Sequence, residues 1–127
     1  MLSKKFRLKD RGDFRRIYQR GKSIACPYFV VYAKRSPSAA RKAARIGFSA
    51  SKKLGNAVTR NRQRRRLSEL CRRNFALFGS QNDYIFIIRN AMKHADNARL
   101  ESSLFFCMNR LSEQQAAKAQ AHAEAVQ

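Results

Sequence analysis

The sequence is poor in acidic residues and has no long apolar run. It holds 8 Asp and Glu against 28 Lys and Arg, which gives a net charge of +20 over 127 residues. No apolar run approaches the roughly 18 residues of a membrane span, and the charged N-terminus lacks the apolar segment of a signal peptide. We therefore expect a cytoplasmic protein without a membrane partner.

Cysteine and histidine are also scarce. Cys26, Cys71 and Cys107 are odd in number, lie far apart and form no Cys-x-x-Cys pair, so neither a zinc site nor a disulfide framework is indicated. We expect them to be small apolar side chains in the core. His94 and His122 lie in polar surroundings. The sequence thus predicts no catalytic residue, no metal site and no cofactor bound by the protein.

The scarcity of acids leaves one long stretch with charge of a single sign. The 55 positions between Asp13 and Glu69 contain no acid and sixteen Lys and Arg. Such a stretch repels itself, and a polyanion is the usual partner that offsets the repulsion. The apolar content of 44% is too high for a disordered basic tail. The composition therefore indicates a folded domain that binds nucleic acid.

Hydrophobic periodicity and turn residues divide the chain into predicted elements. A short helix is expected from the N-cap Asp10 to a stop at Gly21. Residues 23–34 are rich in β-branched and aromatic side chains, with Pro27 at a break that can divide them into two strands. A flexible connection is expected over 35–44, followed by a strand over 45–51 and a helix from Asn56 to about Phe78. A strand over 83–89 is suited to burial on both faces, and the last helix is capped by Asp96 or Asn97.

This order, α-β-β(-β)-α-β-α, predicts an α+β fold in the form of a single-domain α/β sandwich. The domain is expected to span residues 1–113, a length that suits one core. Residues 114–127 are rich in Ala and Gln and have no apolar stripe, so we expect a frayed tail there.

The second predicted helix changes character along its length. Its last turns carry an apolar stripe, but in its first turns the same face carries Arg60 and Arg64, and arginines cover the other directions. A solvated face is the simpler interpretation of a charge run. However, no acid stands three or four residues from Arg60, Arg62 or Arg64, and the planar guanidinium suits bidentate contact with phosphate. The residues just before the helix would widen this patch: Lys52, Lys53 and Asn56.

Three aromatic residues accompany the basic stretch. Phe14 and Tyr18 lie one helical turn apart, and Tyr32 lies on a strand against which that helix would pack. Burial in the core is the simpler interpretation for such rings. The cations interleaved with them, including Arg15 and Arg20, also suit an open groove in which unpaired bases stack. The residue types alone leave both interpretations open.

The run from Arg45 to Glu69, RIGFSASKKLGNAVTRNRQRRRLSE, resembles the signature of the bacterial ribonuclease P protein component. The likeness extends to DFRRIYQRGKS before this run and to DYIFIIR after it, so it covers residues 6–112. The resemblance implies a fold of the ribosomal-protein-S5-domain-2-like kind with a left-handed β-α-β crossover. General chirality rules would favour a right-handed one.

The resemblance also implies a function. The protein would join a large catalytic RNA in the ribonucleoprotein endoribonuclease that removes 5′ leaders from precursor tRNA. Phosphodiester hydrolysis would belong to the RNA component, which would require Mg²⁺, and no protein partner is expected. The alternatives are a structural, ribosomal-protein-like RNA-binding protein without a role in turnover, and a protein-only nuclease.

The site residues implied by the resemblance form two groups. The single-stranded leader would lie in a cleft lined by Phe14, Tyr18 and Tyr32. The catalytic RNA would be contacted by the second predicted helix and the turn before it, through Lys52, Lys53, Asn56, Arg60, Asn61, Arg62, Arg64 and Arg65.

Overall fold

The structure, a computed structural model, describes residues 6–36 and 43–126, with side chains as far as residue 115. The predicted order of elements is confirmed, and residues 23–34 contribute two strands. The connection expected over residues 35–44 lies mostly outside the described residues. In chain order the helices and strands are α1 (Arg11–Arg20), β1 (Lys22–Ala25), β2 (Phe29–Arg35), β3 (Arg45–Ser49), α2 (Ala57–Arg73), β4 (Asn82–Ile88) and α3 (Asn97–Val126).

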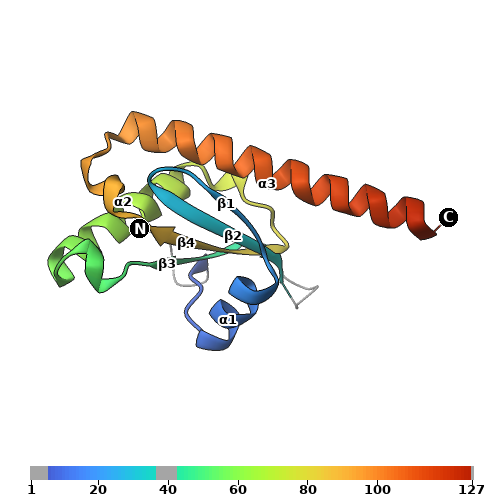
Figure 1. The fold of residues 1–127 in the computed structure, drawn as a ribbon, viewed down its shortest axis with the longest axis horizontal. Coiled ribbons are helices and arrows are strands. Elements are labelled where there is room, and N and C mark those ends of the chain that lie inside the picture. The colour runs from blue at the N-terminus through green and yellow to red at the C-terminus, as the bar shows by residue number, and fades with distance from the viewer. Residues whose placement is uncertain (1–5, 37–42, 127) are drawn as a thin grey trace.

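The four strands form one mixed sheet between two layers of helix, with α1 on one face and α2 and α3 on the other (Figure 1). The strand order is β1-β2-β4-β3; β1, β2 and β4 pair antiparallel, and β3 pairs parallel to β4. The predicted α+β sandwich is therefore confirmed. The parallel pair makes β3-α2-β4 the crossover unit, whose left-handedness stays a prediction.

The larger hydrophobic core lies between the sheet and the α2–α3 layer. From β2, the alternate residues Phe29, Val31 and Ala33 point into it, as their spacing predicts. Phe86 of the internal strand β4 joins this core, while its neighbour Ile85 is buried on the opposite face. Burial of β4 on both faces, predicted from its continuous apolar run, is thus confirmed.

The core on the α1 face is much smaller. It consists of Leu8, Ile17 and Ile85, of which Ile17 is the fully buried residue of α1. The predicted N-cap is confirmed, since Asp10 Oδ1 accepts a hydrogen bond from the Gly12 backbone N–H at 2.7 Å. One buried side chain is little apolar packing for a helix of this length.

A buried carboxylate provides the further attachment of α1 to the sheet. Asp83 of β4 is fully buried, and its Oδ2 accepts from Arg16 Nη2 at 2.7 Å and from Arg45 Nη2 at 2.9 Å. Its Oδ1 accepts from Arg45 Nε at 3.1 Å, and Asp13 of α1 lies 3.5 Å from Arg45 Nη1. A buried charge requires such pairing, so this network joins α1, β3 and β4.

The helix α2 ends at Arg73, before the predicted end near Phe78. Asn74 caps it, because the side-chain amide donates to the carbonyl four residues earlier at 2.9 Å. A short 3-10 helix follows over Phe75–Leu77, and the bend brings the ring of Phe78 to 4.9 Å from that of Tyr84. The prediction was wrong because apolar residues continue on both sides of the bend, so the helical spacing does not reveal it.

Of the two caps predicted for the last helix, Asp96 is the one whose side chain binds a backbone N–H of the helix: its Oδ1 accepts from Arg99 N–H at 2.8 Å. The backbone of α3 remains helical to Val126, beyond residue 113, where the sequence predicts the domain to end. The division into a domain over 1–113 and a tail over 114–127 stays a prediction.

Candidate nucleic-acid interface

The turn before α2 and the first half of α2 bring one predicted group of site residues together. We call this group the basic surface. All its members are exposed except Arg60 and Arg64, which are half-buried. The two lysines lie on a short 3-10 helix over Lys52–Leu54, which leads directly into the N-cap of α2. The basic surface consists of Lys52, Lys53, Asn56, Arg60, Asn61, Arg62, Arg64 and Arg65.

The two asparagines of the basic surface have local partners. Asn56 caps α2, since its Oδ1 accepts from the Thr59 backbone N–H at 2.9 Å. The Oδ1 of Asn61 accepts from Arg64 Nη1 at 3.0 Å, which holds that guanidinium along the helix. Both bonds use the side-chain oxygen, so the amide NH₂ groups are left as donors for a ligand.

The side chains of five cations of the basic surface make no ion pair or hydrogen bond with any residue that the structure describes: Lys52, Lys53, Arg60, Arg62 and Arg65. The Nε atom of Arg60 is buried without a partner. Arg62 and Arg65 border a hollow of 520 Å³, together with Val58, Asn61 and Arg66. Like charges gathered in this way without counter-charges favour an anionic ligand.

Arg66 is turned inward, contrary to the expectation that arginines cover α2 on every side. Its guanidinium donates to the Met92 carbonyl at 2.9 Å and to the Ala95 carbonyl at 2.7 Å. It also donates to Gln63 Oε1 at 2.9 Å, and Gln63 is only 5% exposed. The expectation was wrong because the acceptors lie far along the chain, so Arg66 joins α2 to the segment before α3.

The second predicted group also comes together, on the α1 face of the sheet. We call it the aromatic cleft, formed by Phe14, Tyr18 and Tyr32. The ring of Tyr18 lies 6.1 Å from that of Phe14 and 5.1 Å from that of Tyr32, edge to face in both cases. Tyr18 is 36% exposed, and the other two rings are half-buried. The rings are therefore packed against one another and still accessible at one side.

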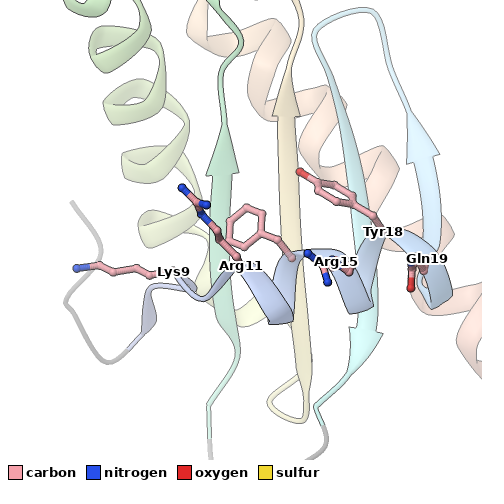
Figure 2. Close-up of a pocket in the computed structure, with 6 residues that line it drawn as sticks. Lys9, Arg11, Arg15, Tyr18 and Gln19 are labelled. Atoms are coloured by element: carbon pink, nitrogen blue, oxygen red, sulfur yellow. The ribbon is translucent and has the colours of Figure 1, made fainter.

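Two rings of the cleft, Phe14 and Tyr18, line a pocket of 510 Å³. The other lining residues come from α1 and the segment before it, and Figure 2 shows Arg11 and Tyr18 projecting from the same edge of the helix. Positions 11, 14, 15, 18 and 19 have the spacing of one helix face. That pattern in the sequence could have identified Arg11 and Gln19, which are missing from the predicted site, whereas Lys9 precedes the helix and lies outside the pattern.

The strand β3 provides part of the surface on which Phe14 and Tyr18 lie. A Cβ on Gly47 would come within 2.6 Å of Phe14 Cζ, so the absence of a side chain there makes room for the ring. Tyr18 lies above the end of the same strand; burial raises the pKa of Tyr18, and a hydrogen bond with Ser49 opposes the shift. Three residues further on, Lys52 begins the basic surface.

The cations interleaved with the aromatic residues have different surroundings. Arg15 lines the pocket beside Phe14 and Tyr18. Arg16 points to the sheet, where it donates to Asp83 and to the Arg35 carbonyl at 3.2 Å. The remaining two, Arg20 and Lys22, line a different hollow. Their order in the sequence did not reveal this division, because it depends on which side of α1 meets the sheet.

The described residues contain no group of three His, Cys, Asp or Glu that could hold a metal ion. Among the helices that the structure describes, none is long and apolar enough to cross a membrane. Cys71 and Cys107 are buried, as expected, whereas Cys26 is only half-buried.

Taken together, the basic surface can bind phosphate groups with its cations, and the aromatic cleft can stack bases against its rings.

Comparison with known proteins connects this geometry to a family. The family model described as ribonuclease P matches residues 2–112. A ribonuclease P protein component from Desulforamulus reducens is 40% identical over 108 residues, which cover 85% of this chain and 93% of the relative. The solved ribonuclease P protein of Staphylococcus aureus matches with a TM-score of 0.70 at 35% identity, covering 82% of this chain and 93% of that one. The protein from Thermotoga maritima matches with a TM-score of 0.71 at 29% identity, covering 82% and 96%.

Proposed function

The chain belongs to the ribonuclease P protein family, and we propose that its two surfaces bind two different RNAs. As a member it is the protein subunit of a ribonucleoprotein endoribonuclease of tRNA processing, with the ribonuclease P RNA as its partner. This membership replaces the alternative of a structural RNA-binding protein without a role in turnover. In our proposal the basic surface binds the catalytic RNA and the aromatic cleft binds the 5′ leader of precursor tRNA.

The proposal rests on five cations of the basic surface whose side chains have no partner among the described residues. A folded domain that keeps Lys52, Lys53, Arg60, Arg62 and Arg65 together without counter-charges needs an external source of negative charge. Guanidinium groups bind phosphates through two parallel hydrogen bonds. The N-terminus of α2 adds backbone N–H groups and a favourable dipole. A structured RNA supplies phosphates at the density that such a surface requires.

The aromatic cleft suits a single strand better than a helix. Bases must be unpaired to stack on protein rings, and Phe14 and Tyr18 line the pocket together with Arg11 and Arg15. In a paired stem the bases are covered by their neighbours. The 5′ leader of a precursor tRNA is a single strand, and the pocket of 510 Å³ is large enough to admit a nucleotide base.

In this proposal the two RNAs would lie side by side along the strand β3. Gly47 and Ser49 contact the rings of the cleft, and Lys52 begins the basic surface directly after the strand. Cations between two polyanions reduce the repulsion between them. The protein would therefore hold the leader against the catalytic RNA.

The magnesium ions required by the RNA component would be held by the RNA. Mg²⁺ prefers carboxylate and phosphate oxygens, and the described residues do not fit this ion, since they offer no cluster of acidic side chains. Phosphate oxygens of the catalytic RNA provide such ligands. We also place the protein in the cytoplasm, where both proposed partners would meet it.

The experiment that tests the proposal compares two variants of the reconstituted holoenzyme. Replacing Arg62 and Arg65 by Ala should weaken binding of the catalytic RNA and lower the salt dependence of log K by about 0.9 for each phosphate that is no longer neutralised. Phe14→Ala should leave that affinity unchanged and weaken binding of leader-bearing substrates by about 1–3 kcal/mol relative to leaderless ones.

The matched control removes the same charge from elsewhere: Arg73→Ala with Arg110→Ala, two exposed residues outside both surfaces. The proposal for the basic surface fails if this control lowers the salt dependence as much as the α2 variant does. The proposal for the cleft fails if Phe14→Ala penalises substrates with and without a leader equally. If wild-type protein does not accelerate cleavage by the RNA at low Mg²⁺, the holoenzyme role is wrong.

A further inference from the structure

A second cationic hollow lies beyond the C-terminal end of α1, and neither proposed surface includes it. It has a volume of 660 Å³. Four cations line it, together with Ala33, the turn over residues 79–82 and Gln115 of α3. We call it the edge hollow, because it lies at the edge of the sheet that is formed by the strand ends, where β1 begins, β2 ends and β4 begins. Its cations are Arg20, Lys22, Lys34 and Arg35.

The fold builds this hollow through a close approach of α1 to β2. A Cβ on Gly21 would lie 2.9 Å from the Ala33 carbonyl oxygen, so the residue between Arg20 and Lys22 almost touches the strand. Lys22 in turn pairs with Ala33 in the register of β1 and β2. The charges that flank Gly21 are thereby placed next to those at the end of β2.

Among the described residues, nothing that lines the edge hollow balances the charge of these cations. No acidic residue is among those that line it, within the part of the chain that the structure describes. The side chains of Arg20, Lys22 and Lys34 have no ion pair or hydrogen bond with any described residue. Arg35 Nη2 donates to Gln81 Oε1 at 2.9 Å, which orients the guanidinium without neutralising it. An anionic ligand would relieve the repulsion among these four groups.

The position of the hollow separates it from the basic surface. It lies where β2 ends and β4 begins, at the paired residues Arg35 and Asn82. The basic surface follows Ser49, which pairs with Ile87 near the other end of β4. The two ends of a strand of 7 residues lie roughly 20 Å apart, at about 3.3 Å per residue.

The same position connects the hollow to the aromatic cleft. The start of α1 lies at β3, where Phe14 meets Gly47, and its end lies at β2, where Gly21 meets Ala33. Figure 2 shows the helix crossing the strands in this way. A strand of RNA that follows the cleft along α1 would therefore leave it at the edge hollow. The described residues that line the hollow include no aromatic ring, so it suits phosphate groups rather than stacked bases.

We propose that the edge hollow binds backbone phosphates of leader nucleotides that lie further from the tRNA than those in the aromatic cleft. This inference rests on the proposed function of the cleft and extends it. Contact with phosphates alone carries no sequence information, so the hollow should increase affinity according to leader length and independently of leader sequence.

The test uses the holoenzyme with precursor tRNAs whose leaders differ only in length. The variant Lys22→Ala with Lys34→Ala should bind substrates with long leaders roughly fivefold more weakly, on the scale of two exposed ion pairs. It should bind substrates whose leaders end within the cleft like the wild type. The salt dependence of log K for long leaders should fall by about 0.7 for each phosphate that the variant no longer neutralises, as expected for a single strand. Arg73→Ala with Arg110→Ala is the control of equal charge.

Phe14→Ala, measured in parallel, separates this inference from the proposed function. If Phe14→Ala reduces the preference for leader-bearing substrates and the edge variant does not alter the effect of leader length, the inference about the hollow is overturned and the cleft stands. If neither variant affects leader-bearing substrates selectively, both the inference about the hollow and the proposed function of the cleft fail. If the edge variant weakens binding of the catalytic RNA and acts equally on all leaders, the hollow binds that RNA instead.

Discussion

The two faces of the sheet are attached to their helices by different kinds of interaction. On the α2–α3 face a large cluster of buried apolar side chains from both helices and the sheet forms the core. On the α1 face, Leu8, Ile17 and Ile85 are the buried apolar residues, and the fully buried carboxylate of Asp83 binds two arginines. Apolar burial is non-directional, whereas the Asp83 network specifies one position of α1.

The difference explains how one small domain can be stable and still present a cleft. A helix that covered the α1 face with apolar side chains would close the surface on which Phe14 and Tyr18 lie. Attachment through one buried residue and one ionic network leaves the rings accessible at the helix edge. The position of α1 therefore depends on a few polar groups, and substitutions of these groups test the difference between the two faces.

The largest expected effect is that of Asp83→Ala. It leaves Arg16 and Arg45 without their common partner beside the sheet, and breaking a buried pair in this way typically destabilises a protein by about 3–5 kcal/mol. Urea denaturation measures the loss, and the preference for leader-bearing substrates should disappear with it. Glu113→Ala, at an exposed site on α3, is the control. An effect of Asp83→Ala no larger than that of the control would contradict the assigned role of the network.

Leu104→Ala tests the opposite face. Leu104 of α3 is fully buried in the larger core, and such truncations cost about 2–5 kcal/mol. The loss of stability should be similar to that of Asp83→Ala, but the folded variant should retain its preference for leader-bearing substrates because α1 is not attached there. Loss of that preference in protein shown to be folded would mean that the two faces are not independent.

Gly47→Ala changes the cleft directly, leaving the Asp83 network and the larger core intact, although the added Cβ would also lie 3.2 Å from the Leu8 carbonyl oxygen. The added Cβ would lie 2.6 Å from Phe14 Cζ, so the ring must move away from β3. Overpacking of this kind costs about 1–3 kcal/mol. Leader discrimination should fall part of the way toward that of Phe14→Ala, with unchanged affinity for the catalytic RNA. Cleavage assays on substrates with and without a leader measure this discrimination. If the variant discriminates as well as the wild type, the contact of Phe14 with Gly47 is not needed for leader binding.

The smallest effect concerns a polar contact at the margin of the larger core. A hydrogen bond from the Cys107 thiol lowers the pKa of Cys26 to about 6, and the pKa of Cys107, which keeps its proton, is raised. Alkylation of Cys26 should therefore be near its maximal rate at pH 7 and should slow as pH falls through about 6, because the thiolate reacts. Buried Cys71 is the unreactive internal reference.

The variant Cys107→Ala checks the cause of that reactivity. Without the donor, the midpoint of the alkylation profile should rise toward the ordinary thiol value of about 8.5. Mass spectrometry of tryptic peptides assigns the modified residue. An unchanged midpoint would mean that Cys107 does not stabilise the thiolate, and that the larger core has no polar contact of this kind at its margin.

The sequence predicted elements whose signals are local. The caps Asp10 and Asn56 accept from backbone N–H groups two or three residues away, and both were identified. The end of α2 was not, because Asn74 ends the helix between two apolar segments. The sequence also did not predict which cations bind acceptors within the protein. Arg16 and Arg66 are as basic as their neighbours, but they donate to acceptors that are remote in the sequence.

The composition by itself determined that the chain carries a concentrated positive charge and needs an anionic partner, because charges adjacent in sequence stay adjacent in any fold. Helical spacing likewise determined which face of α2 could enter a core. The tertiary structure decided which cations have side chains without a partner among the described residues, and that three aromatic rings lie together, two of them lining a pocket. Those outcomes depend on burial, which is set by elements that meet across the sheet: Asp83 with Arg16, Gly47 with Phe14, and Gly21 with Ala33.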